Sequence, residues 1–334
     1  MNRFGKALVA LTACLSLAAC GTGGENPPAG SGSPKDEMVK IGLAQFVSHP
    51  SLDAIAQGFK DEMTDAGYIE GKNVTYDERN PQADQGSLTN IANTFAKDAD
   101  IDLVVAIATP TAQAMAQVIS DRPIVFGAVT DPIAAELVDS WDVPGKNITG
   151  TSDYPPIDQQ ISLLKEIVPD AKVIGIVYSS GEVNAEVQMN LAKAEAEKLN
   201  MTVKTVTVSN SSEVQQNAGS LTGVDAFYVG NDNTVVSGIG GVIQVAETQK
   251  VPLITADPDS VAAGATATFA INQYEMGRNT AKMAIRILEG EDPAKMPVEQ
   301  QAKFAELSIN KGAAARQGVT LPESVLQRAK HVHE

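Results

Sequence analysis

The chain has 334 residues, 43% of them hydrophobic, with 41 acidic and 25 basic side chains and a formal net charge of −16. This length is enough for one large or two ordinary domains with their own cores. The acidic balance excludes nucleic acid as a partner, because phosphate contacts require clustered lysine and arginine, and it argues against adsorption to anionic lipid. Both cysteines, Cys14 and Cys20, lie in the first twenty residues, so the rest of the chain has no disulfide and no cysteine-bound metal.

Residues 1–19 have the features of a secretion signal. Two basic residues precede an apolar run that is too short to remain as a membrane-spanning helix. The run ends in Leu17-Ala18-Ala19-Cys20 and Gly21 follows, a pattern that resembles the bacterial lipobox. The resemblance implies cleavage before Cys20 and attachment of diacylglycerol to its sulfur. An ordinary signal peptide with an incidental cysteine is the alternative.

Residues 20–37 are rich in glycine, proline and serine and have no hydrophobic period, so we predict a flexible tether. A globular body held in this way would be extracytoplasmic and lipid-anchored to the cell membrane. The tether favours a Gram-positive surface over a periplasm.

From residue 38 onward, short apolar runs rich in β-branched residues alternate with segments of helical period. This alternation predicts an α/β protein with parallel sheets. The predicted strands are Val39–Phe46, Val74–Arg79, Asp102–Ala108, Ile124–Val129, Asn147–Ser152, Val173–Tyr178, Thr202–Val208, Ala226–Val229, Pro252–Thr255 and Thr266–Ile271. The predicted helices are Leu52–Ala66, Gln85–Lys97, Thr111–Ile119, Ile157–Ile167, Glu182–Leu199, Thr234–Gln249 and Tyr274–Leu288.

Ten strands in two similar halves predict two doubly wound lobes joined by a hinge. A break falls near residues 150–156, where two prolines prevent a strand from continuing, and a second near residues 270–274. We therefore assign residues 38–152 and 273–334 to lobe 1 and residues 153–272 to lobe 2. A cleft between two such lobes is a ligand site that can close.

Ligands of open parallel sheets bind beyond the carboxyl ends of the strands, so the residues that follow each strand are the candidates. They are Phe46, His49, Thr109, Thr111, Thr130, Asp131, Asp153, Tyr154, Asn231, Asp232, Asn233 and Asp257. Thr109 and Thr130 are expected where helices begin, and free N–H groups there can hold a carboxylate.

Aspartates at the same edge offer acceptors for an ammonium group, and nearby rings offer apolar surface to a side chain. A small zwitterion would use all of these features. Each residue alone could equally be a helix cap or a turn residue.

Catalytic and cofactor motifs are missing from the sequence. There is no phosphate-binding loop and no nucleophile elbow, and His49 is the only histidine before the C-terminal tail. His331 and His333 in that tail have too few other ligands nearby for a metal. We expect no cofactor, no metal and no enzymatic activity, although a hydrolase that uses paired carboxylates stays open.

Six stretches together resemble the tryptophan/tyrosine-type family of ABC-transporter substrate-binding lipoproteins, which have the type I periplasmic-binding-protein fold. They are HPSLD (49–53), IATPTAQA (107–114), VFGAVTDP (125–132), ITGTSD (148–153), VGNDNTV (229–235) and YEMGRNTAKM (274–283), in family order and at family spacing. The resemblance implies a receptor, not an enzyme. It would capture an aromatic amino acid and deliver it to a membrane permease driven by an ATPase.

The hypothesis is therefore a lipid-anchored solute-binding protein for tryptophan, tyrosine or phenylalanine. Thr109, Thr111 and Thr130 would hold the carboxylate of the ligand. Either Asp153, Asp232 or Asp257 would meet the ammonium group, and Phe46, His49 and Tyr154 would border the side chain. A surface lipoprotein that senses the same ligand together with a signalling partner is the other candidate.

Overall fold

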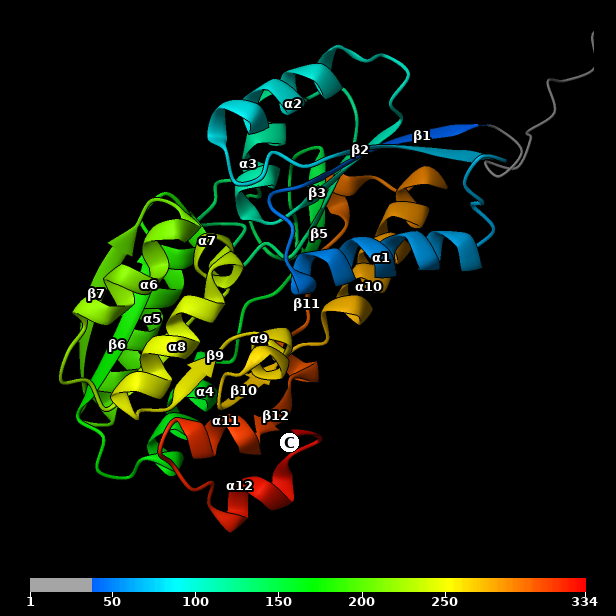
Figure 1. Ribbon diagram of the computed structural model, residues 1–334. Helices are drawn as coiled ribbons and strands as arrows, with labels where there is room; N and C mark the ends of the chain where they lie inside the picture. The colour runs from blue at the N-terminus through cyan, green and yellow to red at the C-terminus, as the bar shows by residue number, and fades with distance from the viewer. Residues whose placement is uncertain (1–37) are drawn as a thin grey trace, which may run out of the picture.

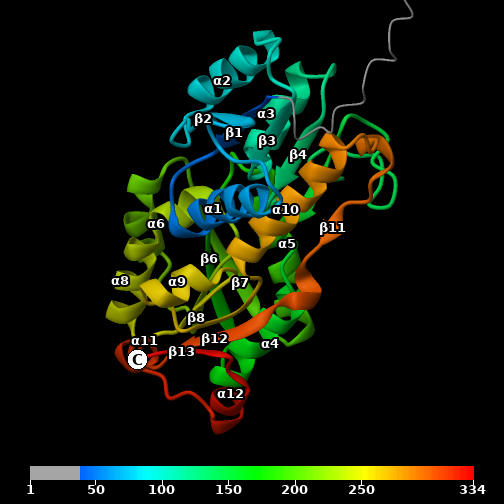
Figure 2. The ribbon, with the colours of Figure 1, turned by 90° about the vertical axis from the view of Figure 1, so that its right-hand side faces the viewer.

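The computed structural model describes residues 38–334, which form two α/β lobes (Figures 1 and 2). The predicted signal peptide, the acylation site Cys20 and the tether lie outside the described residues. Within residues 38–334, no helix is both long enough and apolar enough to cross a bilayer.

Lobe 1 is built on a sheet of six parallel strands in the order β11-β5-β4-β3-β1-β2. The strands are β1 (Val39–Gln45), β2 (Val74–Arg79), β3 (Leu103–Ile107), β4 (Ile124–Gly127), β5 (Ile148–Ser152) and β11 (Glu299–Gln300). The helices are α1 (Pro50–Asp65), α2 (Gln85–Lys97), α3 (Thr109–Val118) and α10 (Gln273–Leu288). Strands β3, β4 and β5 are buried along their whole length, as expected of a parallel sheet covered on both faces.

Lobe 2 has seven strands in the order β13-β12-β10-β9-β8-β6-β7, all parallel to their neighbours except for the antiparallel pair β10 and β12. The strands are β6 (Val173–Ser179), β7 (Thr202–Val208), β8 (Ala226–Val229), β9 (Leu253–Thr255), β10 (Ala267–Ala270), β12 (Glu306–Asn310) and β13 (His331–His333). The helices are α4 (Ile157–Ile167), α5 (Val183–Lys198), α6 (Val214–Ser220), α7 (Asn233–Ser237), α8 (Ile239–Gln249), α9 (Pro258–Ala263), α11 (Lys311–Arg316) and α12 (Glu323–Arg328).

The chain crosses between the lobes after β5, after β10 and after β11. The third crossing corrects the domain assignment made from the sequence, which placed residues 273–334 in lobe 1. Only the part from α10 to β11 belongs there, because β12 and β13 extend the sheet of lobe 2. The reason is hydrophobic burial, since Leu307, Ile309 and Val325 pack into the core of lobe 2.

A second correction concerns the helix predicted over Thr234–Gln249, which the structure divides into α7 and α8 at Gly238. The backbone of Gly238 passes close to neighbouring segments, and a Cβ there would lie 2.9 Å from the carbonyl oxygen of Ser211. The break leaves α7 as a short helix whose first residues face lobe 1.

Helices α1 and α10 lie side by side on one face of the lobe 1 sheet (Figure 2). Their backbones touch at two glycines, because a Cβ on Gly58 would lie 2.1 Å from the carbonyl oxygen of Tyr274, and one on Gly277 equally close to that of Ile55. A side-chain hydrogen bond also links the two helices, because the Tyr274 hydroxyl donates to Asp61 Oδ2 at 2.8 Å. Both helices begin at the cleft between the lobes.

We predict that Gly277→Ala destabilises the protein by about 2 kcal/mol or more, because the added methyl has no space beside the α1 backbone. The matched control is Gly240→Ala in α8, where a Cβ meets nothing within 4 Å. That change should be neutral or stabilise by up to about 1 kcal/mol, as alanine is the better helix former. Chemical denaturation measures both, and equal stabilities of the two variants would contradict the close-contact argument.

Candidate functional site

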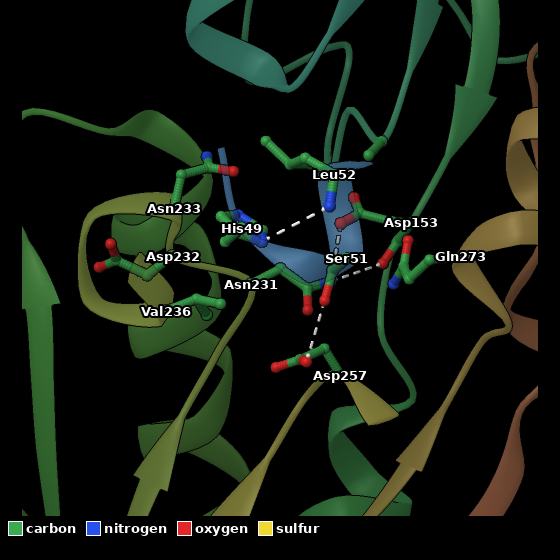
Figure 3. Close-up of a pocket in the computed structure, with 11 residues that line it drawn as sticks. His49, Ser51, Leu52, Asp153, Asn231, Asp232, Asn233, Val236, Asp257 and Gln273 are labelled. Atoms are coloured by element: carbon green, nitrogen blue, oxygen red, sulfur yellow. Dashed lines mark hydrogen bonds between the residues drawn. The ribbon is translucent and has the colours of Figure 1, made fainter. Parts of the chain in front are cut away.

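The carboxyl ends of both sheets face each other across a cleft, and a small cavity lies between them (Figure 3). The cavity has a volume of about 20 Å³, which is room for about one water molecule. Lobe 1 and the crossings contribute His49, Ser51, Leu52, Ala128, Asp153 and Gln273, and lobe 2 contributes Asn231, Asp232, Asn233, Val236 and Asp257. A larger cavity of about 310 Å³ lies further out between α3 and lobe 2, with Phe46 and Glu182 in its wall. The lobes are therefore closed on the inner cavity.

The first turn of α1 connects the lobes directly. Pro50 occupies the first helical position, which sets the helix start and points Ser51 at lobe 2. Its hydroxyl lies 3.1 Å from Asp257 Oδ1 and 2.8 Å from Asp259 Oδ2. Asp257 in turn caps α9, where it accepts hydrogen bonds from the backbone N–H and the hydroxyl of Ser260. This aspartate is thus already well supplied with donors.

Asp153 follows β5 at the first crossing and is buried among neutral groups. Thr130 Oγ1 donates a hydrogen bond of 2.9 Å to its Oδ1, and Asn231 Nδ2 donates one of 2.7 Å to its Oδ2. Gln188 supports both donors, because its side chain bonds Thr130 Oγ1 and the Asn231 N–H. Burial raises the pKa of Asp153 to about 6 despite these bonds. No lysine or arginine lines the cavity among the described residues, so this carboxylate lacks a counter-charge.

Two further carboxylates lie at the start of α7. Asp232 caps the helix through the Val235 N–H and also accepts the Ser179 N–H at 2.5 Å. Glu182, from the start of α5, accepts the backbone N–H and the hydroxyl of Thr234, at 2.9 and 2.7 Å. Burial, followed by the charge of Glu182, raises the pKa of Asp232 well above its ordinary value. The amino end of α7 is therefore already filled by carboxylates of the protein itself.

The amino end of α3, unlike that of α7, has no carboxylate bound to it. Thr109 and Thr111 are almost fully buried, and neither hydroxyl has a hydrogen-bond partner. The residue before the helix, Ala108, has φ +80°, and Ala128 at the end of the neighbouring strand has φ +56°. Such left-handed backbone in non-glycine residues costs energy and is typical of functional sites. The turn at α3 offers free N–H groups and unbonded hydroxyls without any negative charge of its own.

Of the residues predicted from the sequence, six line the inner cavity: His49, Asp153, Asn231, Asp232, Asn233 and Asp257. Thr109 and Thr111 lie in the first turn of α3 and do not line this cavity, and Thr130 donates a hydrogen bond to Asp153. Phe46 borders the outer cavity.

Two of the sequence expectations differ from the structure. No helix begins at Thr130, because Asp131 closes a turn with the N–H groups of Ile133 and Ala134. Tyr154 does not line the inner cavity and packs edge-on against Trp141, with ring centroids 6.5 Å apart.

The candidate list drawn from the sequence left out Ser51, Leu52, Ala128, Val236, Gln273, Glu182 and Gln188, which line or support the site. Ser51 could have been found as the helix residue after the His49-Pro50 start signal. Gln188 carries no such signal, because it lies in the middle of α5 and reaches the site only through the approach of the two lobes.

Asp153→Asn should change the pH dependence of stability in the ligand-free protein. A raised carboxyl pKa contributes stability that is present below about pH 3.8 and is lost as the pH rises through about 6. Relative to wild type, the free energy of unfolding of the variant should therefore gain about 2 to 3 kcal/mol between pH 4 and pH 7.5. Urea denaturation at both values measures this difference, and a constant offset would refute the raised pKa.

Comparisons with known proteins agree on one family. Residues 40–333 match the family model described as ABC transporter substrate binding protein. The tyrosine-binding protein of Clostridioides difficile is 39% identical over 289 residues, which cover 86% of this chain and 82% of that protein.

Solved structures give the same result. The ABC domain from Streptococcus pneumoniae in complex with L-Trp has a TM-score of 0.85 at 39% identity, over 89% of this chain and all of that one. The ligand-free, open structure of a substrate binding protein with adhesive properties from Clostridium difficile has a TM-score of 0.67 at 37% identity, over 89% of this chain and 99% of that one. The lobes of the present structure are thus arranged more like those of the complex than those of the open protein.

These matches confirm the family resemblance and the two-lobe fold that the sequence analysis predicted. The matched region runs from the first strand to the last and includes every residue of the cleft described above. The chain belongs to the family of ABC transporter substrate binding proteins.

Proposed function

We propose that this protein is an extracytoplasmic, lipid-anchored receptor that captures an aromatic amino acid between its lobes and delivers it to an ABC permease and its ATPase. The proposal rests on one observation: the cleft contains both carboxylates without a counter-charge and a helix amino end without an anion. Buried carboxylates there have no cation, and the amino end of α3 has unbonded hydroxyls and no anion. A zwitterion supplies a cation to the carboxylates and an anion to the helix end. The tyrosine-binding and tryptophan-bound relatives support an aromatic amino acid as this zwitterion.

The carboxylate of the ligand binds at the start of α3 in this proposal. An anion is stabilised at a helix amino end by free N–H groups and the helix dipole. Several helices begin at the cleft, but side chains already cap the amino ends of α1, α7, α9 and α10. Helix α3 has no side-chain cap. The hydroxyls of Thr109 and Thr111 stay unbonded until an acceptor arrives, and an unsatisfied buried donor costs about 1–3 kcal/mol.

The ammonium group of the ligand meets Asp153, which is the one left without a structural task among the three candidate aspartates. Asp232 and Asp257 each cap a helix through a backbone N–H, whereas Asp153 caps no helix and accepts hydrogen bonds from the side chains of Thr130 and Asn231. Neutral side-chain donors can turn away when a cation approaches. The ammonium charge also removes the cost of holding this carboxylate ionised in a buried place.

Membrane attachment through Cys20 is part of the same proposal and follows from the lipobox-like sequence. Metabolic labelling with a radioactive fatty acid tests it. Label should enter the wild-type protein and be absent from Cys20→Ser. Label in both proteins would refute acylation at this residue.

A thermal denaturation screen against the twenty amino acids tests the ligand class. An amino acid present at 100 times its dissociation constant should stabilise the protein by about 2.7 kcal/mol, because it binds only the folded state. We expect the melting temperature to rise with an aromatic amino acid and to stay unchanged with small sugars and nucleosides. A rise with a sugar alone would overturn the proposal.

Thr109→Val and Thr111→Val test the carboxylate site, since valine keeps the shape of threonine and lacks the hydroxyl. Each variant should weaken binding about tenfold or more, the value of a hydrogen bond to a charged group. Thr248→Val is the control, because that hydroxyl bonds the carbonyl of Gln244 on the far side of lobe 2. Titration calorimetry gives the affinities, and unchanged values in both cleft variants would place the carboxylate elsewhere.

A further inference from the structure

His49 has a structural task that determines which of its ring nitrogens carries hydrogen. It is the N-cap of α1, and its Nδ1 accepts the backbone N–H of Leu52 at 3.5 Å. A neutral imidazole has one donor and one acceptor nitrogen, so accepting at Nδ1 places the hydrogen on Nε2. Burial lowers the pKa of the His49 imidazole below its ordinary value, which keeps the ring neutral.

The Nε2–H of His49 is a buried donor without a partner. The side chain is 8% exposed, and Nε2 makes no hydrogen bond. Asn233 and Asp257 face the ring from lobe 2, and the Asn233 side chain lies close enough to interact with the imidazole. Neither residue makes a hydrogen bond of normal geometry to Nε2. Figure 3 shows the imidazole at the edge of the inner cavity, on the side opposite Asp153. A donor left unbonded at such a place is available to a ligand.

The strand order places His49 at the far end of the ligand. Along the cleft edge of lobe 1 the order is β5, β4, β3, β1, and these strands lead to Asp153, Ala128, the start of α3 and His49, respectively. Neighbouring strands lie about 4.8 Å apart, so β5 and β1 are separated by about 14 Å. The inner cavity holds only about one water molecule, so an amino acid enters it when the lobes move apart. With its ammonium group at Asp153 and its carboxylate at α3, it then extends its side chain toward β1 and His49.

We propose that His49 Nε2–H recognises a hydrogen-bond acceptor at the tip of the ligand side chain, which makes tyrosine the preferred ligand. The inference rests on the function proposed above and adds its specificity. The phenol oxygen of tyrosine can accept this hydrogen, whereas the indole nitrogen of tryptophan is a donor only and phenylalanine has no polar atom. Asn233 and Asp257 offer acceptors for the hydrogen of the phenol. A site with a buried donor rejects ligands that leave that donor unpaired.

Titration calorimetry of the full chain with tyrosine, phenylalanine and tryptophan tests the inference. We expect tyrosine to bind about ten- to a hundredfold more tightly than phenylalanine, the range for leaving one buried donor unpaired. Tryptophan should also bind more weakly than tyrosine, because its N–H would face the N–H of His49.

The informative variant is His49→Ser, since serine is a good N-cap and keeps the acceptor for Leu52, but its hydroxyl lies next to the backbone and cannot donate from the position of Nε2. Its affinity for tyrosine should fall to that for phenylalanine while its melting temperature stays close to that of wild type. Asp84→Ser is the matched control, because Asp84 caps α2 through the Ser87 N–H and lies outside the inner cavity. That variant should keep the full preference for tyrosine.

Nitrogen-15 NMR of the imidazoles gives an independent measurement on the ligand-free protein, because the chain has only three histidines. His49 should show hydrogen on Nε2, and the signal of that nitrogen should move when tyrosine is added.

The outcomes separate the two proposals. Amino acid binding without a preference for tyrosine, or a preference that survives His49→Ser, overturns the role of His49 and leaves the proposed function intact. Hydrogen on Nδ1 in the NMR spectrum overturns the role of His49 as well. Absence of binding by any amino acid overturns the proposed function and the specificity together.

Discussion

The contact between α1 and α10 is the constraint on which the site depends. Gly58 and Gly277 let two helix backbones meet where any larger residue would separate them. This contact fixes the first turn of α1, which carries His49 and Ser51, and the first residue of α10, which is Gln273. Because α10 begins directly after the second crossing, the same contact also fixes one of the three connections of the hinge. Cleft residues from distant parts of the chain thus take their positions from one packing interaction.

Electrostatics gives the cleft a direction. Lobe 2 places its own carboxylates at the start of α7, and lobe 1 leaves the start of α3 without an anion. In the function proposed above, a ligand with separated charges therefore has one orientation, with its carboxylate at the start of α3 and its ammonium group at Asp153. The arrangement carries a stability cost, since Asp153 and Asp232 are buried without a cation. Such locally unfavourable groups are typical of sites adapted to binding.

Most of the fold could be predicted from local patterns. The segments Val74–Arg79 and Thr202–Val208 are strands with the predicted bounds. Both contain apolar residues in alternation with polar ones, which is typical of a strand. The strands β11, β12 and β13 were missed, because they contain no run of consecutive apolar residues, unlike the equally short strands β8 and β9. The break at Gly238 was also missed, because its cause is a tertiary contact with Ser211 that leaves no local trace.

The candidate site was predictable to a similar degree. Strand ends identified where the polar residues gather, and this followed from the sheet topology alone. The sequence could not tell apart Asp153, Asp232 and Asp257, because an aspartate that caps a helix and one that faces a ligand have the same local pattern. Only the three-dimensional contacts distinguish the aspartates that cap α7 and α9 from the one bonded by Thr130 and Asn231. The same holds for Nε2 of His49, whose lack of a partner depends on both lobes.

The chain order of the two lobes has a consequence for biosynthesis. Lobe 1 lacks one of its helices and an edge strand until α10 and β11 have been made, and lobe 2 lacks two strands until residue 333. Domains generally fold as units while the chain emerges from the ribosome. In this protein no unit is complete until almost the whole chain has emerged, so the nascent polypeptide stays without a finished core. A polypeptide without a finished core can pass through a narrow translocation channel. Export of a protein that works outside the cytoplasm requires this.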